Sequence, residues 1–187
     1  MKSPQSTEEI ADCTSEFAEA GFSGCIGSAD VTHVILEKCH ARLKNQNSGG
    51  KDSHTTRAFQ IVVNHRRQII ASTVGYPGHW NDKTIVRFDG FITDIQRGLY
   101  LNDNVFSLID DEGNEVQYKG AWILVDGGHL NWSCLICPFK NTISIREQRW
   151  SRWAESMRKD VECTFGILKG KNISGLLFID LRHFSCT

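Results

Sequence analysis

The stretch that decides the fold is Gly120–Gly128, which reads Gly-Ala-Trp-Ile-Leu-Val-Asp-Gly-Gly. Five apolar residues end at Asp126, and the two glycines that follow can turn the chain sharply. This pattern predicts a fully buried strand with an acid at its carboxyl end. In an open α/β sheet, ligands bind beyond the carboxyl ends of the strands, so an acid there indicates a binding crevice. The alternative, that Asp-Gly-Gly is turn chemistry alone, stays open at this point.

The composition is that of an ordinary globular protein. The chain has 187 residues, of which 40% are apolar and 23% are charged, and this predicts one domain with a real core. Its seven cysteines are irregularly spaced, and polar residues follow Met1, which favours reduced thiols in an intracellular protein that is not secreted. No window reaches the roughly eighteen apolar residues that a membrane span needs.

Three strands and a helix are predicted before the decisive stretch. Ser6 and Glu9 form a capping box that opens an amphipathic helix, which ends at Gly21. Residues 24–36, 57–64 and 69–75 are β-favouring and form a predicted meander. The first strand contains a lone acid, Asp30. An unpaired carboxylate in a buried strand is costly, so Asp30 needs a partner, a metal ion or solvent, and a hydrogen-bonded structural aspartate is the alternative.

The remaining elements are placed by turn and capping signals. Residues 41–55 predict an exposed loop, and Asn81-Asp82 predicts the cap of one helix that runs to Ile95 and covers the sheet. Residues 105–118 predict an inserted hairpin with an acidic tip, whose ligand pattern disfavours calcium binding. Residues 132–139 predict a short apolar helix or turn. A long helix follows, with an apolar stripe from Trp150 to Leu168.

This order of elements predicts an α/β fold: a ribonuclease H-like mixed sheet flanked by helices, with the inserted hairpin before the fourth strand. In such folds, acids on the first and fourth strands and on a late helix meet at one edge of the sheet. The acids in those places are Asp30, Asp126 and Glu162. Asp160 and Glu155 compete for the third place, and the alternative for Glu162 is an ion pair with Arg158, four residues earlier.

Three clustered carboxylates imply divalent cations, because like charges oppose one another's ionisation. Ligand sets made only of oxygen favour Mg²⁺ or Mn²⁺ over zinc. Two such ions about 4 Å apart can clamp the attacking and leaving oxygens of a phosphoryl transfer and activate water. Cys134 and Cys137 have zinc-ligand spacing, but no second pair follows at a usable distance, which disfavours structural zinc.

Four motifs in order resemble the DDE-superfamily endonuclease domain of PIF/Harbinger-type transposases, a transposase-derived nuclease family. They are Gly27–His33, Tyr76–Thr84, Val125–Trp132 and Glu155–Lys169, with 36 residues from Asp126 to Glu162. The resemblance covers roughly residues 24–171. It implies a catalytic and metal-binding triad of Asp30, Asp126 and Glu162 that holds Mg²⁺ or Mn²⁺ in a two-metal site, cuts DNA at transposon ends and joins them to a target. It also implies a place in the nucleus.

Basic residues fit a nucleic-acid partner. Residues 140–171 hold eight bases against four acids, while residues 79–120 hold eight acids against four bases, which predicts a basic face and an acidic lobe. The side chains that could meet DNA phosphates are Arg57, Arg66, Arg67, Arg146, Arg149, Arg152, Arg158 and Lys159. A solvated charged face is the alternative for each of them. His33, three residues after Asp30, is predicted to pack on the other face of its strand.

The predicted organisation is a lead-in helix over residues 1–23, a nuclease domain over 24–171 that is truncated at its C-terminal end, and a divergent tail over 172–187. No helix-turn-helix module precedes Gly24, so a separate DNA-binding protein would supply the recognition of DNA ends. Two other functions stay open. One is a catalytically inactive remnant that binds DNA or protein, and the other is an ordinary ribonuclease H-like nuclease acting on RNA.

Overall fold

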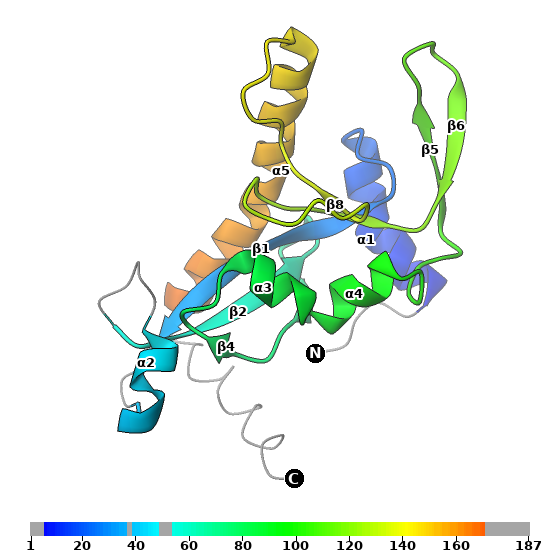
Figure 1. Ribbon diagram of the computed structural model, residues 1–187. Coiled ribbons are helices and arrows are strands. Elements are labelled where there is room, and N and C mark those ends of the chain that lie inside the picture. The colour runs from blue at the N-terminus through cyan, green and yellow to red at the C-terminus, as the bar shows by residue number, and fades with distance from the viewer. Residues whose placement is uncertain (1–5, 37–38, 49–53, 171–187) are drawn as a thin grey trace.

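A mixed β-sheet forms the centre of the computed structural model, which describes residues 6–36, 39–48 and 54–170 (Figure 1). The strands follow one another in the order β3-β2-β1-β7-β8, and β4 also pairs with β2. β1, β2 and β3 are antiparallel, whereas β7 runs parallel to β1 and β8 parallel to β7. The strands span Cys25–Ile35 (β1), Thr56–Val63 (β2), Ile69–Ser72 (β3), Tyr76–Pro77 (β4), Trp122–Leu124 (β7) and Leu135–Ile136 (β8). This arrangement confirms the predicted α/β fold with a mixed, ribonuclease H-like sheet.

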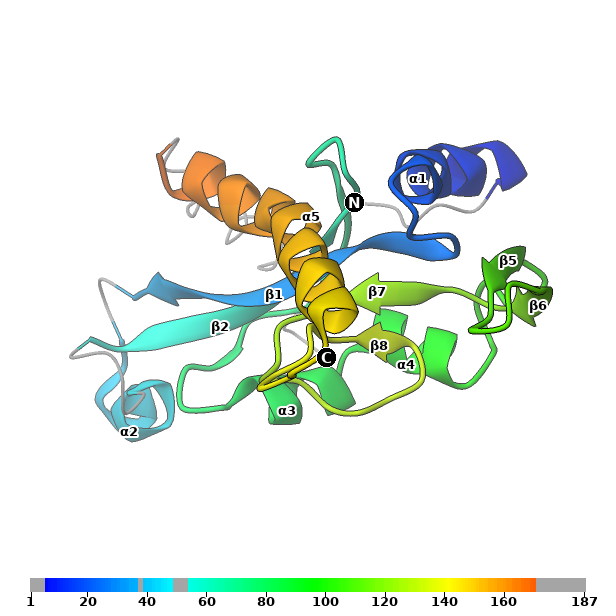
Figure 2. The same cartoon turned by 90° about the horizontal axis from the view of Figure 1, so that it is seen from above.

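Helices cover both faces of the sheet. α1 and α5 lie on one face, and α3 and α4 lie on the other (Figure 2). On the first face Phe17, Leu124 and Met157 belong to one buried cluster, and on the second Ile92 packs with Ile123. Burial on both faces explains why the central strands read as nearly continuous apolar runs. The helices span Thr7–Glu19 (α1), Lys44–Asn47 (α2), Asp82–Arg87 (α3), Gly90–Gln96 (α4) and Ile145–Gly170 (α5), with a 3-10 turn at Ala41–Leu43.

Capping motifs in the sequence predicted correctly where α1 and α3 begin. Ser6 Oγ accepts from the backbone N–H of Glu9 at 3.1 Å, and the Glu9 carboxylate accepts from Ser6 N–H at 3.2 Å, which completes the capping box of α1. Asn81 Oδ1 likewise accepts from Thr84 N–H at 2.8 Å and begins α3. No helix in the described part of the chain is long and apolar enough to cross a membrane.

Three local predictions were wrong. The single helix expected to run to Ile95 is broken into α3 and α4, because Asp89 caps a new helix with its own side chain. The apolar stretch around residue 135 forms strand β8 instead of a helix, since Ile123 N–H donates to Cys134 O and Val125 N–H to Ile136 O. The loop expected over 41–55 contains the 3-10 turn and α2. The predicted tail, 172–187, lies outside the described residues.

Asp89 is a buried acid at the α3–α4 junction. Only 4% of the residue is exposed, and its Oδ1 accepts from Phe91 N–H at 2.9 Å and Ile92 N–H at 3.3 Å. Its Oδ2 accepts from Gln60 Nε2 at 2.9 Å, while Gln60 Oε1 has no partner among the described residues. Burial raises the pKa of Asp89 to about 6, against the opposing effect of the two backbone hydrogen bonds.

Asp89→Asn should remove one contribution to the pH dependence of the free energy of unfolding. Because the pKa of Asp89 is higher in the folded than in the unfolded chain, its contribution to stability is complete below about pH 4 and is lost as the pH rises through 6. A shift of this size is worth about 3 kcal/mol. Asparagine keeps the cap, and its amide can donate to Gln60 Oε1 if the Gln60 amide turns over.

The measurement is urea unfolding between pH 4 and 7. The free energy of unfolding of the wild type should fall by about 2–3 kcal/mol more than that of the variant over this range. Asp94→Asn, at an exposed position of α4, should behave like the wild type. Parallel curves for Asp89→Asn and the wild type would show that Asp89 is not the titrating group.

The hairpin inserted before the fourth strand is confirmed. It consists of β5 (Val105–Ile109) and β6 (Glu115–Lys119), which form a separate two-stranded sheet. The hairpin projects from the body on the same side as the N-terminal end of α5 (Figure 1).

Candidate active site

Asp30 lies in the middle of β1, on the face that α5 covers. Its partner in β2 is Ile61. Asp30 Oδ1 accepts from Val31 N–H at 2.8 Å, and Oδ2 accepts from Arg158 Nη1 at 3.2 Å. Burial raises the pKa of Asp30, and the Val31 hydrogen bond and the Arg158 charge oppose that rise. The partner that the sequence required for this partly buried acid is therefore Arg158.

Asp126 lies two residues beyond the end of β7, which is parallel to β1 and adjacent to it. Its Oδ1 accepts from Gly128 N–H at 3.0 Å and lies 2.5 Å from His129 Nδ1. The His129 hydrogen bond lowers the pKa of Asp126 to about 2, although burial acts in the opposite direction. Asp126 is thus an ionised carboxylate at neutral pH. The negative charge of Asp126 in turn raises the pKa of Asp30, so the two carboxylates interact electrostatically.

Glu162 projects from the middle of α5, with half of its side chain exposed. Its Oε1 accepts from Arg158 Nη2 at 2.9 Å. The ion pair that the spacing of four residues suggested is therefore present. This ion pair also connects Glu162 to Asp30, because the same Arg158 guanidinium contacts both carboxylates.

Arg158 connects the three acids. Its guanidinium donates to Asp30 and Glu162, and its charge also lowers the pKa of Asp126. Only 15% of the side chain is exposed, and its Nε has no hydrogen-bond partner among the described residues. One cation thus lies between the carboxylate of Asp30 on β1 and that of Glu162 on α5, while Asp126, in the loop after β7, is hydrogen-bonded to His129.

The donor chemistry of this edge suits a hard divalent cation. All three side chains offer carboxylate oxygens, the ligands that Mg²⁺ and Mn²⁺ prefer, and the position among them already accommodates a positive charge. Within the described residues, however, no group of three or more acid, histidine or cysteine side chains is close enough to hold an ion as it stands. Binding an ion between Asp30 and Glu162 would require the Arg158 side chain to move.

The two competing acids on α5 lie elsewhere. Asp160 is buried and pairs with His65 Nδ1 at 2.5 Å and Arg67 Nε at 3.1 Å. Its carboxylate therefore binds the β2–β3 turn to α5. Glu155 is exposed on the helix surface. His33 contacts Thr56 Oγ1 at 3.1 Å, in line with the predicted packing role.

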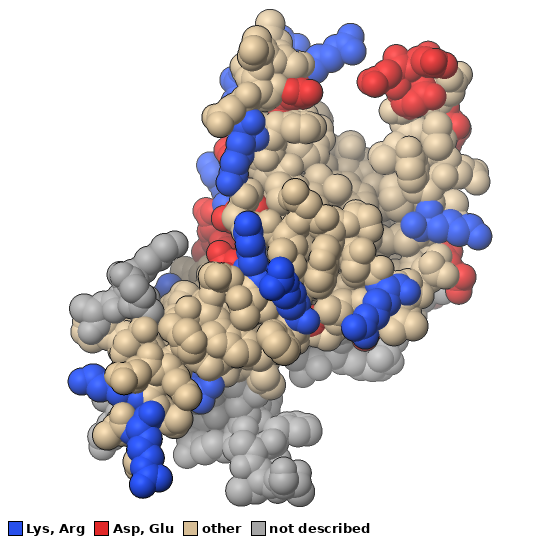
Figure 3. Space-filling view, viewed as in Figure 1, with Lys and Arg blue, Asp and Glu red and all other residues tan. Residues whose placement is uncertain are grey.

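Several of the basic residues hold the fold together. Arg66 bridges Asp12 and Glu16 of α1, each at 2.8 Å, and Arg67 pairs with Asp160. Arg57 donates to Gly75 O at 2.8 Å. In contrast, the described part of the chain gives no ion pair to the exposed α5 residues Arg146, Arg149, Arg152 and Lys159. Figure 3 shows basic side chains along α5 and acidic ones at the hairpin tip.

Sequence reasoning missed two residues beside Asp126. His129 is 3% exposed, and its Nε2 has no partner among the described residues. Lys140 donates to Gly127 O at 2.6 Å, and a Cβ on Gly127 would lie 2.1 Å from Lys140 Cε. A larger residue at 127 would therefore displace the Lys140 side chain. The Asp-Gly-Gly-His spacing signals a turn in which residue 129 can reach back to Asp126, but nothing local predicts Lys140.

His129→Phe should raise the pKa of Asp126 from about 2 toward the usual range for aspartate, because the main cause of its depression is removed. Phenylalanine fills the buried volume without the hydrogen bond. The measurement is a carbon-13 NMR titration of the Asp126 carboxyl group. His79→Phe, at an exposed position, serves as the control, and an unchanged Asp126 titration in His129→Phe would contradict the assignment.

A family model described as "Plant transposon protein" matches residues 2–173 of the chain. Among curated proteins, the chain is similar to "Protein ALP1-like" from Arabidopsis thaliana, with 24% identity over 167 residues. The match covers 88% of this chain and 40% of the relative, so the chain spans about two fifths of that protein's length. No solved structure matches. The chain therefore belongs to the plant transposon protein family and contains a nuclease-like domain of Harbinger transposase origin.

Proposed function

We propose that the chain is a divalent-metal-dependent DNA endonuclease of the transposase type, with Asp30, Asp126 and Glu162 as its catalytic carboxylates. The observation that carries the proposal is the guanidinium of Arg158, which donates to both Asp30 and Glu162 and whose charge also lowers the pKa of Asp126. Acids that are 132 residues apart in the sequence converge there on one cation.

Asp30, Asp126 and Glu162 would hold Mg²⁺ or Mn²⁺, which when bound stabilises charge on a phosphate and lowers the pKa of a bound water. The chain's own residues prepare the site for this. The His129 hydrogen bond keeps Asp126 ionised and fixes the orientation of its carboxylate. Arg158 balances the charge of Asp30 and Glu162 in the ion-free protein. Arg152 and Lys159, which are exposed on α5, would contact the phosphates of a DNA strand.

A second function, a non-catalytic module that binds DNA, is favoured by one observation. Arg158 occupies the position between Asp30 and Glu162, and the carboxylates among the described residues do not form a ready ion site. In such a module the acids would serve to hold the Arg158 side chain in place. Under either function the chain would act on DNA in the nucleus, with a separate protein or region supplying the recognition of DNA ends.

The experiment is thermal unfolding with and without Mn²⁺, followed by cleavage of supercoiled duplex DNA. An ion concentration of about ten times Kd should stabilise the folded protein by roughly 1.4 kcal/mol, which is a few degrees in Tm. The endonuclease should then nick the duplex in Mn²⁺ but not in a chelator. Cooperative unfolding without a Mn²⁺ shift and without nicking would favour the binding module. Cleavage of an RNA–DNA hybrid in preference to the duplex would favour a ribonuclease.

A further inference from the structure

The β5–β6 hairpin exposes apolar side chains that the rest of the described chain does not cover. It forms a sheet of only two strands, and a hairpin of this size is marginally stable without further packing. Its exposed apolar residues are Val105 at 52%, Leu108 at 37%, Ile109 at 69% and Tyr118 at 46%. The base is anchored by Phe106, whose ring stacks on Tyr118 and lies against Gly24.

The tip of the hairpin is acidic. Asp110 organises the turn, because its Oδ1 accepts from Glu112 N–H at 2.9 Å and Asn114 N–H at 2.8 Å. Asp111, Glu112 and Glu115 are exposed and form no ion pair in the part of the chain that the structure describes. The hairpin therefore presents exposed apolar side chains below a cluster of negative charge.

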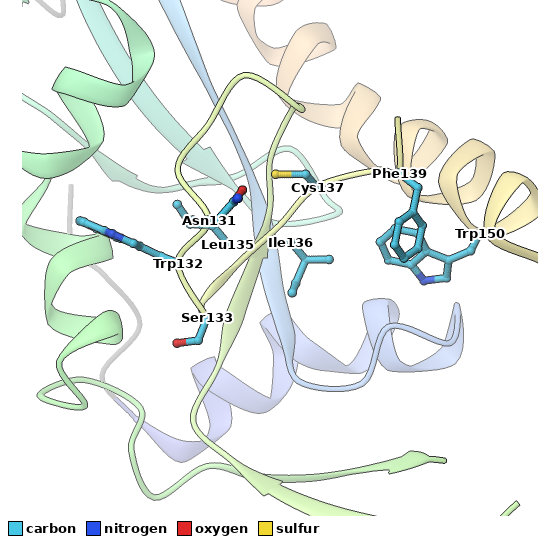
Figure 4. A pocket seen from close by; sticks show the side chains of 8 residues that line it. All are labelled: Asn131, Trp132, Ser133, Leu135, Ile136, Cys137, Phe139 and Trp150. Carbon is cyan, nitrogen blue, oxygen red and sulfur yellow. The ribbon is translucent and has the colours of Figure 1, made fainter. Parts of the chain in front are cut away.

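The N-terminal part of α5 and the segment before it expose apolar side chains and positive charge. These complement the exposed apolar side chains and the negative charge of the hairpin. Exposed apolar side chains here are Phe139 at 54%, Ile143 at 97%, Ile145 at 66% and Trp153 at 53%. Beside them lies an open pocket of about 740 Å³, whose lining includes Leu135, Ile136, Phe139 and Trp150 (Figure 4). The rings of Phe139 and Trp150 meet at 5.4 Å between centroids, so one wall of the pocket is aromatic.

The positive charge beside this pocket comes from Arg146 and Arg149. Arg146 is one turn before Trp150, and both arginines share a flank of α5 with Trp153 by helical spacing. Arg158 and Glu162 lie on the opposite flank by the same spacing, where they meet Asp30. A partner bound at the first flank would leave the three acids open.

We propose that two copies of this chain associate reciprocally, with the hairpin of each copy docked on the N-terminal part of α5 of the other. The acidic tip of one copy would meet Arg146 and Arg149 of its partner, and Val105 and Ile109, which share one face of the hairpin, would cover the pocket region. The hairpin and α5 project from the same side of the body (Figure 1), and the space-filling view shows a hollow between them (Figure 3). A twofold axis through that hollow makes both contacts at once, as a self-complementary interface requires.

The test is sedimentation velocity on two charge-reversed variants of the full chain. The hairpin variant carries Asp111→Lys and Glu112→Lys, and the helix variant carries Arg146→Glu and Arg149→Glu. The wild type should be a dimer whose dissociation constant rises with salt. Each variant should dissociate with a constant at least about tenfold higher, because like charges then face each other across the interface.

Mixing the two variants provides the decisive result. In an equimolar mixture, the lysines of the hairpin variant meet the glutamates of the helix variant, and the other contact retains its natural charges, so the dimer should return. Lys83→Glu with Arg87→Glu on α3, on the other face of the sheet, is the matched control and should leave the dimer unchanged. Circular dichroism confirms that each variant is folded.

Three results would overturn the proposal. A monomeric wild type at every concentration would assign these surfaces to a different partner. A dimer that survives in both variants would place the interface elsewhere. Folded, monomeric variants whose mixture stays monomeric would show that the hairpin and α5 do not meet across copies.

Discussion

Asp30→Asn and Asp126→Asn should each lower the rate of metal-dependent DNA cleavage by about 10³-fold or more. Asparagine preserves the size of each side chain and can still accept from Val31 N–H or Gly128 N–H, so the fold should survive. What is lost is the negative charge that, under the proposed function, would hold the cation. The loss should therefore appear in ion binding as well as in the cleavage rate.

The readout is the initial rate of plasmid nicking in Mn²⁺, measured beside the Mn²⁺-induced change in Tm. Both should vanish together in the two variants. Asp94→Asn, which removes an exposed acid from α4, should retain both. If a variant without the Asp30 or Asp126 charge still nicked DNA at the wild-type rate, these acids would not form the active site.

Arg158→Met should have opposite effects on the ion-free and the ion-bound protein. In the ion-free protein it leaves Asp30 and Glu162 without their partner. We expect a loss of about 1–2 kcal/mol in the free energy of unfolding, less than for a fully buried pair because Glu162 is half exposed. With Mn²⁺ present, the variant should recover most of this loss, since the ion takes over the neutralisation of both carboxylates.

The measurement is urea unfolding of wild type and variant across a Mn²⁺ titration. The stabilisation by Mn²⁺ should be larger in Arg158→Met, and its midpoint should fall at a lower ion concentration. Arg152→Met, one and a half turns earlier on the exposed side of α5, is the matched control. A Mn²⁺ response in Arg158→Met as weak as that of Asp30→Asn would mean that the guanidinium supports the site and does not compete with the ion.

The behaviour of Arg158 separates the two functions proposed for this chain. In an endonuclease the guanidinium is a replaceable counter-ion, whereas in a binding module it is a permanent partner of the acids. Its contacts agree with both descriptions, because a cation between Asp30 and Glu162 lowers their repulsion in either case. Only the response to Mn²⁺ distinguishes a position that an ion can take from one that it cannot.

Sequence patterns predicted those parts of the structure whose causes are local. The capping box at Ser6 and the Asn81 cap were recognised because the bonding partners lie three residues away. The buried strand before Asp126 was recognised because it is apolar on both faces. Local sequence patterns failed where the same residues fitted two kinds of element about equally well. The α3–α4 break depends on Asp89, an acid inside an apolar helical pattern, and β8 is strand because β7 lies beside it.

By itself the sequence determined the order of the main elements and the family, and it predicted Asp30, Asp126 and Glu162 as the acids of the site. Tertiary structure alone decided what those acids contact. Burial of Asp30 in β1 opposes its ionisation, and Arg158, 128 residues away, counters that effect. His129 reaches back to depress the pKa of Asp126, and Arg66 and Arg67, although half exposed, form ion pairs with α1 and α5. The reason is physical: a charged side chain is governed by its nearest partner and by its distance from water, and for distant segments both are set only when the chain folds.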